Sequence, residues 1–278
     1  MTASPLGSAV GARVAGVPPG RYGFGGILRS EWTKLRTVRS TVWTLGLTIA
    51  IGIGIAAVAT AETRSHWSSM GLVTRLTFDP VGTSLAGALF AQLTVGILGV
   101  LVVSAEYGTG TIRATFAAAP RRPLVLVAKV TVFGVTALLV SEIVTFASFT
   151  LGQSLLSAPV PHATFATPGA WRAVVGTGLY LCVIGLLALG LAAIIRHTAG
   201  AITAFVALLL VLPIVVHALP SSIANAVERY FPDRIGATMI ALHHGPHSFA
   251  PWTGFGLLCG YAVVALVIGG ALVVRRDA

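Results

Sequence analysis

Residues 173–219 read AVVGTGLYLCVIGLLALGLAAIIRHTAGAITAFVALLLVLPIVVHAL and are the strongest indication of the architecture. They contain two apolar runs, 173–195 and 200–219, without any Asp, Glu, Lys or Arg. Each run has roughly the 20 residues that an α-helix needs to cross the hydrocarbon of a bilayer. Because the turn at residues 196–199 is very short, we expect the two helices to pack as an antiparallel hairpin.

Four further runs have the same character: 42–61, 85–104, 124–150 and 253–274. The third is long for one crossing, and we expect its membrane core to begin after Lys129. Only 9% of the 278 residues are charged, 55% are hydrophobic, and the mean hydropathy is +0.90, whereas a soluble domain carries about 25% charged residues. The sequence therefore predicts an all-α integral membrane protein with six transmembrane helices.

The distribution of Lys and Arg predicts the orientation. If the N-terminus is cytoplasmic, five of the 18 basic residues fall outside and all others inside; the five are Arg64, Arg75, Arg172, Arg229 and Arg234. This bias favours cytoplasmic N- and C-termini. An even number of crossings agrees with this, because it places both termini on the same side of the membrane. The formal charge of +10 is explained by this topology, and nucleic acid is not expected as a partner, because the basic residues form no stripe with aromatic residues.

Two segments flank the first membrane crossing on its N-terminal side. Residues 1–26 are rich in Gly, Ala and Pro, have no continuous apolar signal region, and are expected to form a flexible cytoplasmic tail. In residues 27–39 (ILRSEWTKLRTVR), Leu28, Trp32 and Leu35 follow helical spacing among basic residues. This pattern favours an amphipathic helix on the inner leaflet, the alternative being a plain positively charged flank.

The segment 105–123 (AEYGTGTIRATFAAAPRRP) connects the second and third crossings on the predicted cytoplasmic side. Gly108, Gly110 and Pro120 interrupt it, and residues 111–119 have the length of a short helix. Its apolar face would carry Ile112, Thr115, Phe116 and Ala119. A short apolar face flanked by Arg predicts a docking element, and the alternative is a loop that lies on the lipid.

The sequence contains no recognisable catalytic pattern. Neither of the two lysines, Lys34 and Lys129, stands in a GxxxxGK[ST] loop, and no G-x-S-x-G elbow is present. The histidines at 243–247 (HHGPH) are interpreted as a solvated outer loop rather than a metal site. We therefore expect no enzyme activity and no metal or cofactor on this chain.

Two polar residues within the apolar runs are candidates for a substrate path. Glu142 is acidic within the third run, where a charge is costly unless it faces protein or water. It is interpreted as a substrate contact, a proton site or a polar tether, with a purely structural hydrogen bond as the alternative. Gln92 in the second run is a weaker candidate of the same kind.

Several small residues and one outer segment complete the predictions. Gly256 and Gly260 form a GxxxG pair, which indicates either packing within one subunit or a seam between two copies. Cys182 and Cys259 are expected to be unpaired packing residues. In the outer segment 220–251, we expect a short external or re-entrant helix that ends before Pro232.

Two motifs together resemble the permease subunits of ABC-2 type ABC transporters, over most of the chain from Leu28 to Arg276. The stretch 30–45 (SEWTKLRTVRSTVWTL) is similar to stretches in actinobacterial permeases of this type. The second motif is the run from Glu106 (EYGTGTIR), followed by Pro120, Arg121, Arg122 and Lys129. It resembles the family's pattern of an acidic residue, a Gly-Thr step, a short helix, and then Pro with basic residues.

The resemblance implies a six-helix transmembrane domain over residues 27–278, with an elbow helix at 27–39 and a cytoplasmic coupling helix at 111–119. The implied elbow residues are Glu31, Trp32, Lys34, Leu35 and Arg36; the implied ATPase-coupling residues are Glu106, Gly108, Thr111, Ile112, Arg113, Thr115, Phe116, Pro120, Arg121 and Arg122. It also implies a plasma-membrane assembly with a second copy of this chain and two ATP-binding cassette ATPase subunits, which would carry ATP and Mg.

The sequence is compatible with three functions. The first is the permease half of an exporter that moves a drug, an antibiotic or a lipid by alternating access. The second is a self-contained secondary transporter or channel that uses Glu142. The third is a membrane-embedded enzyme built around the histidines at 243–247. The resemblance favours the first, and it does not identify the substrate.

Overall fold

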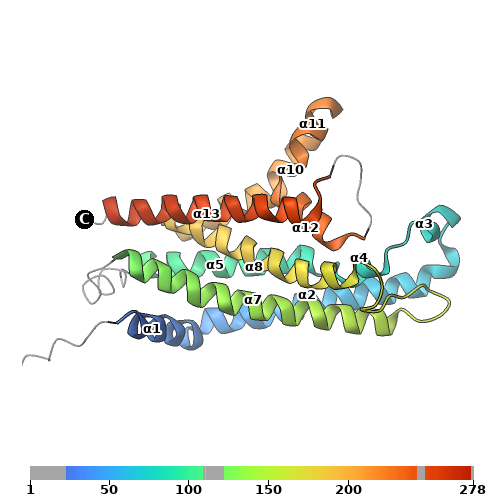
Figure 1. Ribbon diagram of the computed structural model, residues 1–278, viewed down its shortest axis with the longest axis horizontal. Coiled ribbons are helices and arrows are strands. Elements are labelled where there is room, and N and C mark those ends of the chain that lie inside the picture. Colours follow the sequence, from blue (N-terminus) through green and yellow to red (C-terminus); the bar gives the residue numbers. More distant parts are fainter. Residues whose placement is uncertain (1–22, 109, 111–121, 243–247, 277–278) are drawn as a thin grey trace, which may run out of the picture.

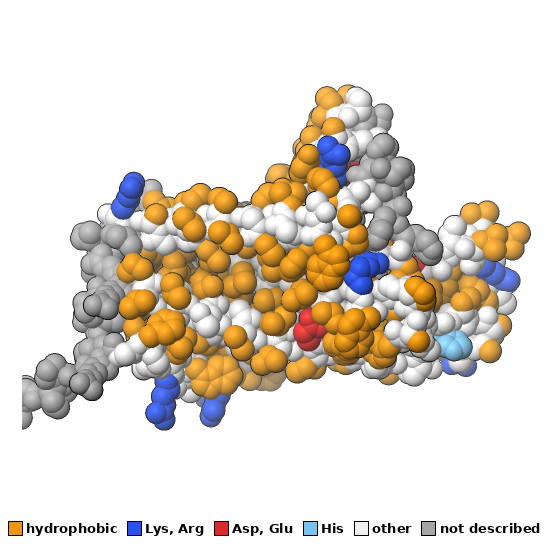
Figure 2. Space-filling model, in the orientation of Figure 1, with side chains coloured by type: hydrophobic (Ala, Val, Ile, Leu, Met, Phe, Trp, Pro, Cys, Tyr) orange, Lys and Arg blue, Asp and Glu red, His pale blue; other side chains and the backbone are white. Residues whose placement is uncertain are grey.

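The computed structural model describes residues 23–108, 110, 122–242 and 248–276, and within these the chain is helical without strands. Six helices are long and apolar enough to cross a membrane, as the sequence predicts. They cover Arg39–Ser69, Ala88–Gly108, Pro123–Leu155, Ala170–Ile195, Thr198–His217 and Pro251–Val273. They form one elongated bundle with hydrophobic side chains over most of its length (Figures 1 and 2).

The fourth crossing, α8 (Ala170–Ile195), is the centre of the bundle. It packs against α5 (Ala88–Gly108), α7 (Arg122–Leu155) and α13 (Pro251–Arg276). Its most apolar stretch is 72% buried, against 17% for the first crossing, α2 (Arg39–His66). Small residues in α5 and α8 allow this close packing, and α2 leaves much of its surface to lipid or to another chain.

The two ends of the bundle are formed by different helices. At one end, the α1 end, lie α1 (Phe24–Thr37), the last turn of α5 and the first turns of α7. At the other end, the α4 end, lie the 3-10 turn Trp67–Ser69, α3 (Leu72–Leu76), α4 (Pro80–Ser84) and α12 (Pro232–Ile240). The segment 109–121 therefore connects two helices at the α1 end (Figure 1).

The fifth crossing is irregular. It consists of α9 (Thr198–Val206), a π-helical stretch (Ala207–Val211) and α10 (Leu212–His217), and α11 (Ser221–Glu228) follows it. Pro213 lacks the N–H that a regular helix needs, and the wide turn before it accommodates this loss. Figure 1 shows α10 and α11 leaving the side of the bundle, and Ile214 is 70% exposed.

Several boundaries differ from the predictions for identifiable reasons. The third crossing is one continuous helix from Arg122 to Leu155, and it begins two turns before Lys129, the residue after which the sequence predicts the membrane core to start. Pro232 does not merely stop the outer helix but begins α12, as Pro commonly does at the first position of a helix. The short turn after α8 is confirmed: Arg196 ends the helix with φ 62° and α9 begins at Thr198.

The glycines separate into packed and open positions. Gly256 and Gly260 have no atom within 4 Å of the position that a Cβ would take, so packing within the subunit does not explain this pair. Gly176 and Gly190, by contrast, have neighbouring side-chain or backbone atoms within 3 Å of that position. Cys182 and Cys259 are both free, as expected.

Candidate functional site

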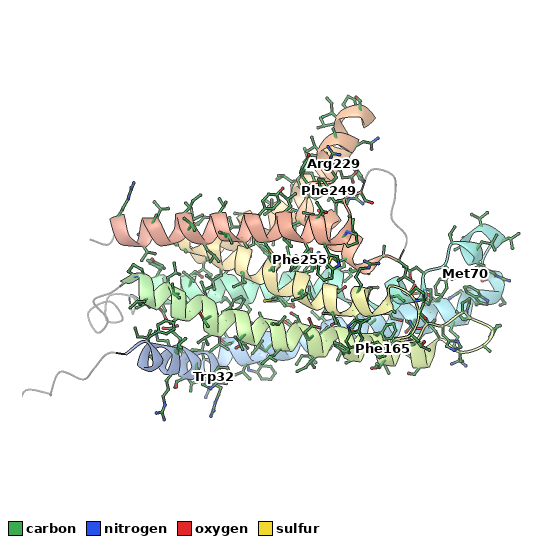
Figure 3. The ribbon with its side chains drawn as sticks, viewed as in Figure 1. Trp32, Met70, Phe165, Arg229, Phe249 and Phe255 are labelled. Carbon is green, nitrogen blue, oxygen red and sulfur yellow. The ribbon has the colours of Figure 1, made fainter. Side chains whose placement is uncertain are left out.

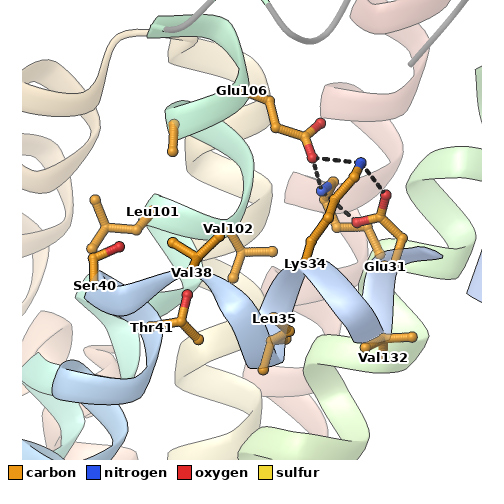
Figure 4. Close-up of a pocket in the computed structure, with 12 residues that line it drawn as sticks. Glu31, Lys34, Leu35, Val38, Ser40, Thr41, Leu101, Val102, Glu106 and Val132 are labelled. Atoms are coloured by element: carbon orange, nitrogen blue, oxygen red, sulfur yellow. Dashed lines mark hydrogen bonds and ion pairs between the residues drawn. The ribbon is translucent and has the colours of Figure 1, made fainter. Parts of the chain in front are cut away.

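Four charged side chains from three helices form a closed cluster at the α1 end, called the charge ring below. It consists of Glu31 and Lys34 of α1, Glu106 of α5 and Lys129 of α7 (Figure 4). The Lys129 ammonium lies 2.6 Å from Glu31 and 2.9 Å from Glu106, and the Lys34 ammonium lies 2.7 Å and 2.9 Å from the same two carboxylates. Each carboxylate therefore meets both ammonium groups, and the four charges cancel.

Three members of the charge ring are deeply buried. The side chains of Glu31, Lys129 and Glu106 are 4%, 6% and 12% exposed, whereas Lys34 is 36% exposed. Burial by itself disfavours the Lys34 ammonium, but hydrogen bonds to Glu31 and Glu106 outweigh burial and raise its pKa. Removing one of the three buried members would leave an uncompensated buried charge, so the ring holds α1, α5 and α7 together as one unit.

Local structure explains why these side chains meet. Glu31 and Lys34 are three residues apart on α1 and therefore lie on one face, together with the buried Leu35. Val38 adopts an extended conformation (φ −74°, ψ 115°), which separates α1 from α2. The break allows α1 to pack against α7, where Lys129 lies two turns after the first residue of the helix.

A cavity of about 390 Å³ lies next to the charge ring (Figure 4). Leu35, Val38, Leu101, Val102 and Val132 supply apolar walls, and the charge ring closes one side of it. The cavity thus combines an apolar interior with a strongly polar boundary, the usual character of small-molecule and lipid sites in proteins.

The sequence assigned Glu31, Lys34 and Glu106 to two separate elements, and the structure brings them together. Lys129 was not predicted as a site residue, although a lysine inside an apolar run needs a buried counter-ion, and this signal was present in the sequence. Trp32, also on α1, is 45% exposed and is not a member of the charge ring (Figure 3). Arg36 is exposed as well.

Most of the predicted coupling residues lie outside the described residues. These are Thr111, Ile112, Arg113, Thr115, Phe116, Pro120 and Arg121. The histidines at 243–247 also lie outside the described residues. Gly108 is the last residue of α5, and Arg122 is the first of α7. The charge ring therefore joins the two helices that the segment 109–121 connects.

Gln92 lies in a second cavity, of about 260 Å³, toward the α4 end between α4, α5, α8 and α12. Gln92 is 1% exposed, and its side-chain oxygen accepts a hydrogen bond of 2.5 Å from the Tyr180 hydroxyl. Gln92 Nε2 and Asp233 Oδ1 are buried without a hydrogen-bond partner among the described residues. Burial raises the pKa of Asp233 above its ordinary value.

We expect Tyr180→Phe to lower the free energy of unfolding by about 1–3 kcal/mol, because it leaves the buried Gln92 oxygen without its donor. The measurement is equilibrium unfolding in mixed micelles. Tyr261→Phe is the matched control, since the Tyr261 hydroxyl makes a longer, exposed contact of 3.3 Å with the Tyr230 carbonyl. Equal effects of the two substitutions would contradict the role of the Gln92 contact.

Glu142 is separate from Gln92 in the structure. Glu142 lies against Gly178, while Tyr180, which holds Gln92, is two residues further along α8. Residues two apart point about 200° away from each other on a helix, so the two predicted path residues lie on opposite sides of α8. Gln92 and Tyr180 line the cavity of about 260 Å³, and Glu142 is not among its lining residues.

Comparison with known proteins gives no family for this chain: no protein-family model matches it, and no curated protein matches it either.

Proposed function

We propose that this chain is the membrane-spanning permease subunit of an ATP-driven exporter of the ABC-2 type. The observation that carries the proposal is the position of the charge ring. It fixes α1 to the helix ends on both sides of the segment 109–121, through Glu106 two residues before Gly108 and through Lys129 in the first turns of α7. The sequence motifs that resemble this family contain all four residues of the ring.

The proposed mechanism follows from this connection. A partner ATPase docks on the segment 109–121, with Ile112 and Phe116 as apolar contacts and Arg113 as a charged one. ATP and Mg bind to the partner, and the closure of two ATPase subunits moves the segment. Because breaking a buried ion pair is costly, the movement passes to α1, α5 and α7 together rather than to the loop alone.

The proposed setting is the plasma membrane, with both termini in the cytoplasm and a second copy of this chain in the assembly. The excess of Lys and Arg at the α1 end supports this orientation. The apolar walls of the cavity beside the charge ring favour a hydrophobic or amphipathic cargo over a polyanion.

Co-purification with the neighbouring ATPase subunit tests the proposal. We expect Phe116→Ala and Arg113→Glu each to reduce the ATPase recovered with the permease by about tenfold, because each removes a contact of the docking segment. Arg64→Glu is the matched control: Arg64 is exposed near the α4 end, and its reversal leaves the recovery unchanged.

Recovery at wild-type yield with both docking variants would contradict the proposed role of the segment. Failure to recover any ATPase with the wild-type chain would instead favour the self-contained transporter. That alternative has its own support in Glu142, a carboxylate in a membrane crossing that has no ion-pair partner in the described parts of the chain. Transport driven by a pH gradient without ATP, and lost in Glu142→Gln, distinguishes it.

A further inference from the structure

The carboxylate of Glu142 rests on a glycine of the neighbouring helix. A Cβ atom built on Gly178 of α8 would lie 2.5 Å from Glu142 Oε1. Any larger residue at position 178 would therefore displace the carboxylate, and the glycine makes the space in which the carboxylate lies. Gly178 belongs to the central helix of the bundle, so the position of this space is fixed by helix packing.

The Glu142 carboxylate makes no ion pair with any residue that the structure describes. Its Oε2 atom is buried without a hydrogen-bond partner among the same residues. Arg172 lies six residues before Gly178 on α8 but binds other groups. Its guanidinium donates hydrogen bonds to the backbone carbonyls of Thr238, Met239 and Ala241. A carboxylate inside a membrane is costly without a counter-charge, so a cation from outside the described chain is the matching occupant.

Aromatic rings lie one to two helical turns from the carboxylate along the same α7–α8 seam. Phe146 is one turn beyond Glu142 on α7, and Trp171 is two turns before Gly178 on α8; their rings are 5.5 Å apart. Phe165 contacts both, at 5.8 Å and 5.6 Å (Figure 3 labels Phe165). Aromatic faces attract cations, most strongly where water is excluded, so rings and carboxylate favour the same kind of ligand.

The seam is open to the surrounding membrane. Leu139 and Ile143, the neighbours of Glu142 on α7, are 59% and 56% exposed, and Trp171 is 58% exposed. Trp171 is the second residue of its crossing, at the depth where Trp side chains meet the membrane–water interface. Glu142 lies opposite Gly178, seven residues or about 10 Å deeper.

We propose that Glu142, which lies against Gly178 one to two helical turns from Phe146 and Trp171, binds the positively charged group of a hydrophobic organic cation, and that this cation enters sideways from the lipid past the aromatic rings. Weakly hydrated cations of this kind fit because they lose little hydration on leaving water, whereas Na⁺ and K⁺ would have to give up tightly held water. The site itself stands on the contacts above. That the bound cation is the exported cargo rests on the proposed function.

The test measures binding to the permease alone, in nanodiscs of uncharged phosphatidylcholine, with tetraphenylphosphonium as the probe in equilibrium dialysis and empty nanodiscs as the background. We expect Glu142→Gln to weaken binding by about tenfold or more, since it removes the charge and keeps the shape. Trp171→Ala is expected to weaken binding by about threefold. Glu62→Gln is the matched control, because Glu62 is exposed near the end of α2, and it leaves binding unchanged.

Gly178→Ala provides a second route to the same site, because its methyl group moves the carboxylate without removing it. We expect this substitution to weaken tetraphenylphosphonium binding while the protein keeps its elution volume in size-exclusion chromatography, which reports that it is still folded. Wild-type affinity in Glu142→Gln, or no wild-type binding above empty nanodiscs, would overturn the site. Since no ATPase is present, a failure here concerns only the cation site, and a failure of co-purification concerns only the proposed function.

Discussion

Lys129→Met is expected to lower the free energy of unfolding by about 3–5 kcal/mol, because it leaves two buried carboxylates to share one ammonium. Lys129 is 6% exposed and binds Glu31 and Glu106 at 2.6 Å and 2.9 Å, and Glu31 itself is 4% exposed. Water does not reach the position of the Lys129 ammonium to replace the lost charge. Equilibrium unfolding in mixed micelles, with thermal unfolding by intrinsic fluorescence beside it, measures the effect.

Lys34→Met is the matched control for Lys129→Met. It removes the same charge from the same two carboxylates, but Lys34 is 36% exposed, so water enters in its place. We expect a loss of roughly 0–1 kcal/mol, the usual range for exposed ion pairs. Equal losses in the two variants would show that the charge ring does not depend on burial.

A double variant separates the ion pair from the volume of the lysine side chain. Lys129→Met combined with Glu31→Gln removes the uncompensated charge as well as its partner. We expect it to recover part of the stability lost in Lys129→Met, because replacing both members of a buried pair is far less costly than removing one. Additive losses from the two substitutions would instead place the effect in side-chain packing.

Gly99→Ala is expected to destabilise the bundle by at least about 2 kcal/mol, or to prevent accumulation of the folded protein. Gly99 of α5 faces Gly185 of α8, and a Cβ on Gly99 would collide with the Gly185 backbone carbonyl. A side chain in the way could rotate aside, but here two helix backbones would have to separate along the most buried contact of the bundle. Yield and equilibrium unfolding measure the outcome.

Gly260→Ala is the matched control, since no atom lies within 4 Å of the position of its added methyl group. The substitution is expected to be neutral, or slightly stabilising because Ala favours the helix more than Gly. A loss as large as that of Gly99→Ala would contradict the packing described for α13. A change in oligomeric state with unchanged stability would assign the GxxxG face to contact between two copies.

The fold was largely predictable, because the requirement for a crossing is local. About 20 apolar residues without charge satisfy the bilayer wherever they occur, so all six crossings followed from composition along the chain. What the sequence does not show depends on remote partners. Lys129 predicts an edge of the membrane core, but its counter-ion Glu31 stands 98 residues earlier in the chain and could not be identified from neighbouring residues.

The candidate sites were predictable by residue but not by grouping. Glu142 and Gln92 stood out because polar groups in apolar runs are costly, yet nothing in the sequence indicated that they face opposite sides of α8. Likewise, the sequence predicts Glu31 and Lys34 in one element and Glu106 in another, without indicating that they meet. Helical periodicity defines the faces of one helix, and it contains no information on which face meets which neighbour.

The sequence by itself determined the class of protein, the number of crossings and the absence of a phosphate-binding lysine loop, because hydropathy and short motifs are properties of neighbouring residues. Tertiary structure alone decided that four distant charges close into a ring, that Gly99 allows two backbones to meet and that the Glu142 carboxylate lies against Gly178. These features depend on how the helices are rotated and spaced. Helix packing sets rotation and spacing, since in lipid the helices gain their contacts from close fit rather than from the exclusion of water.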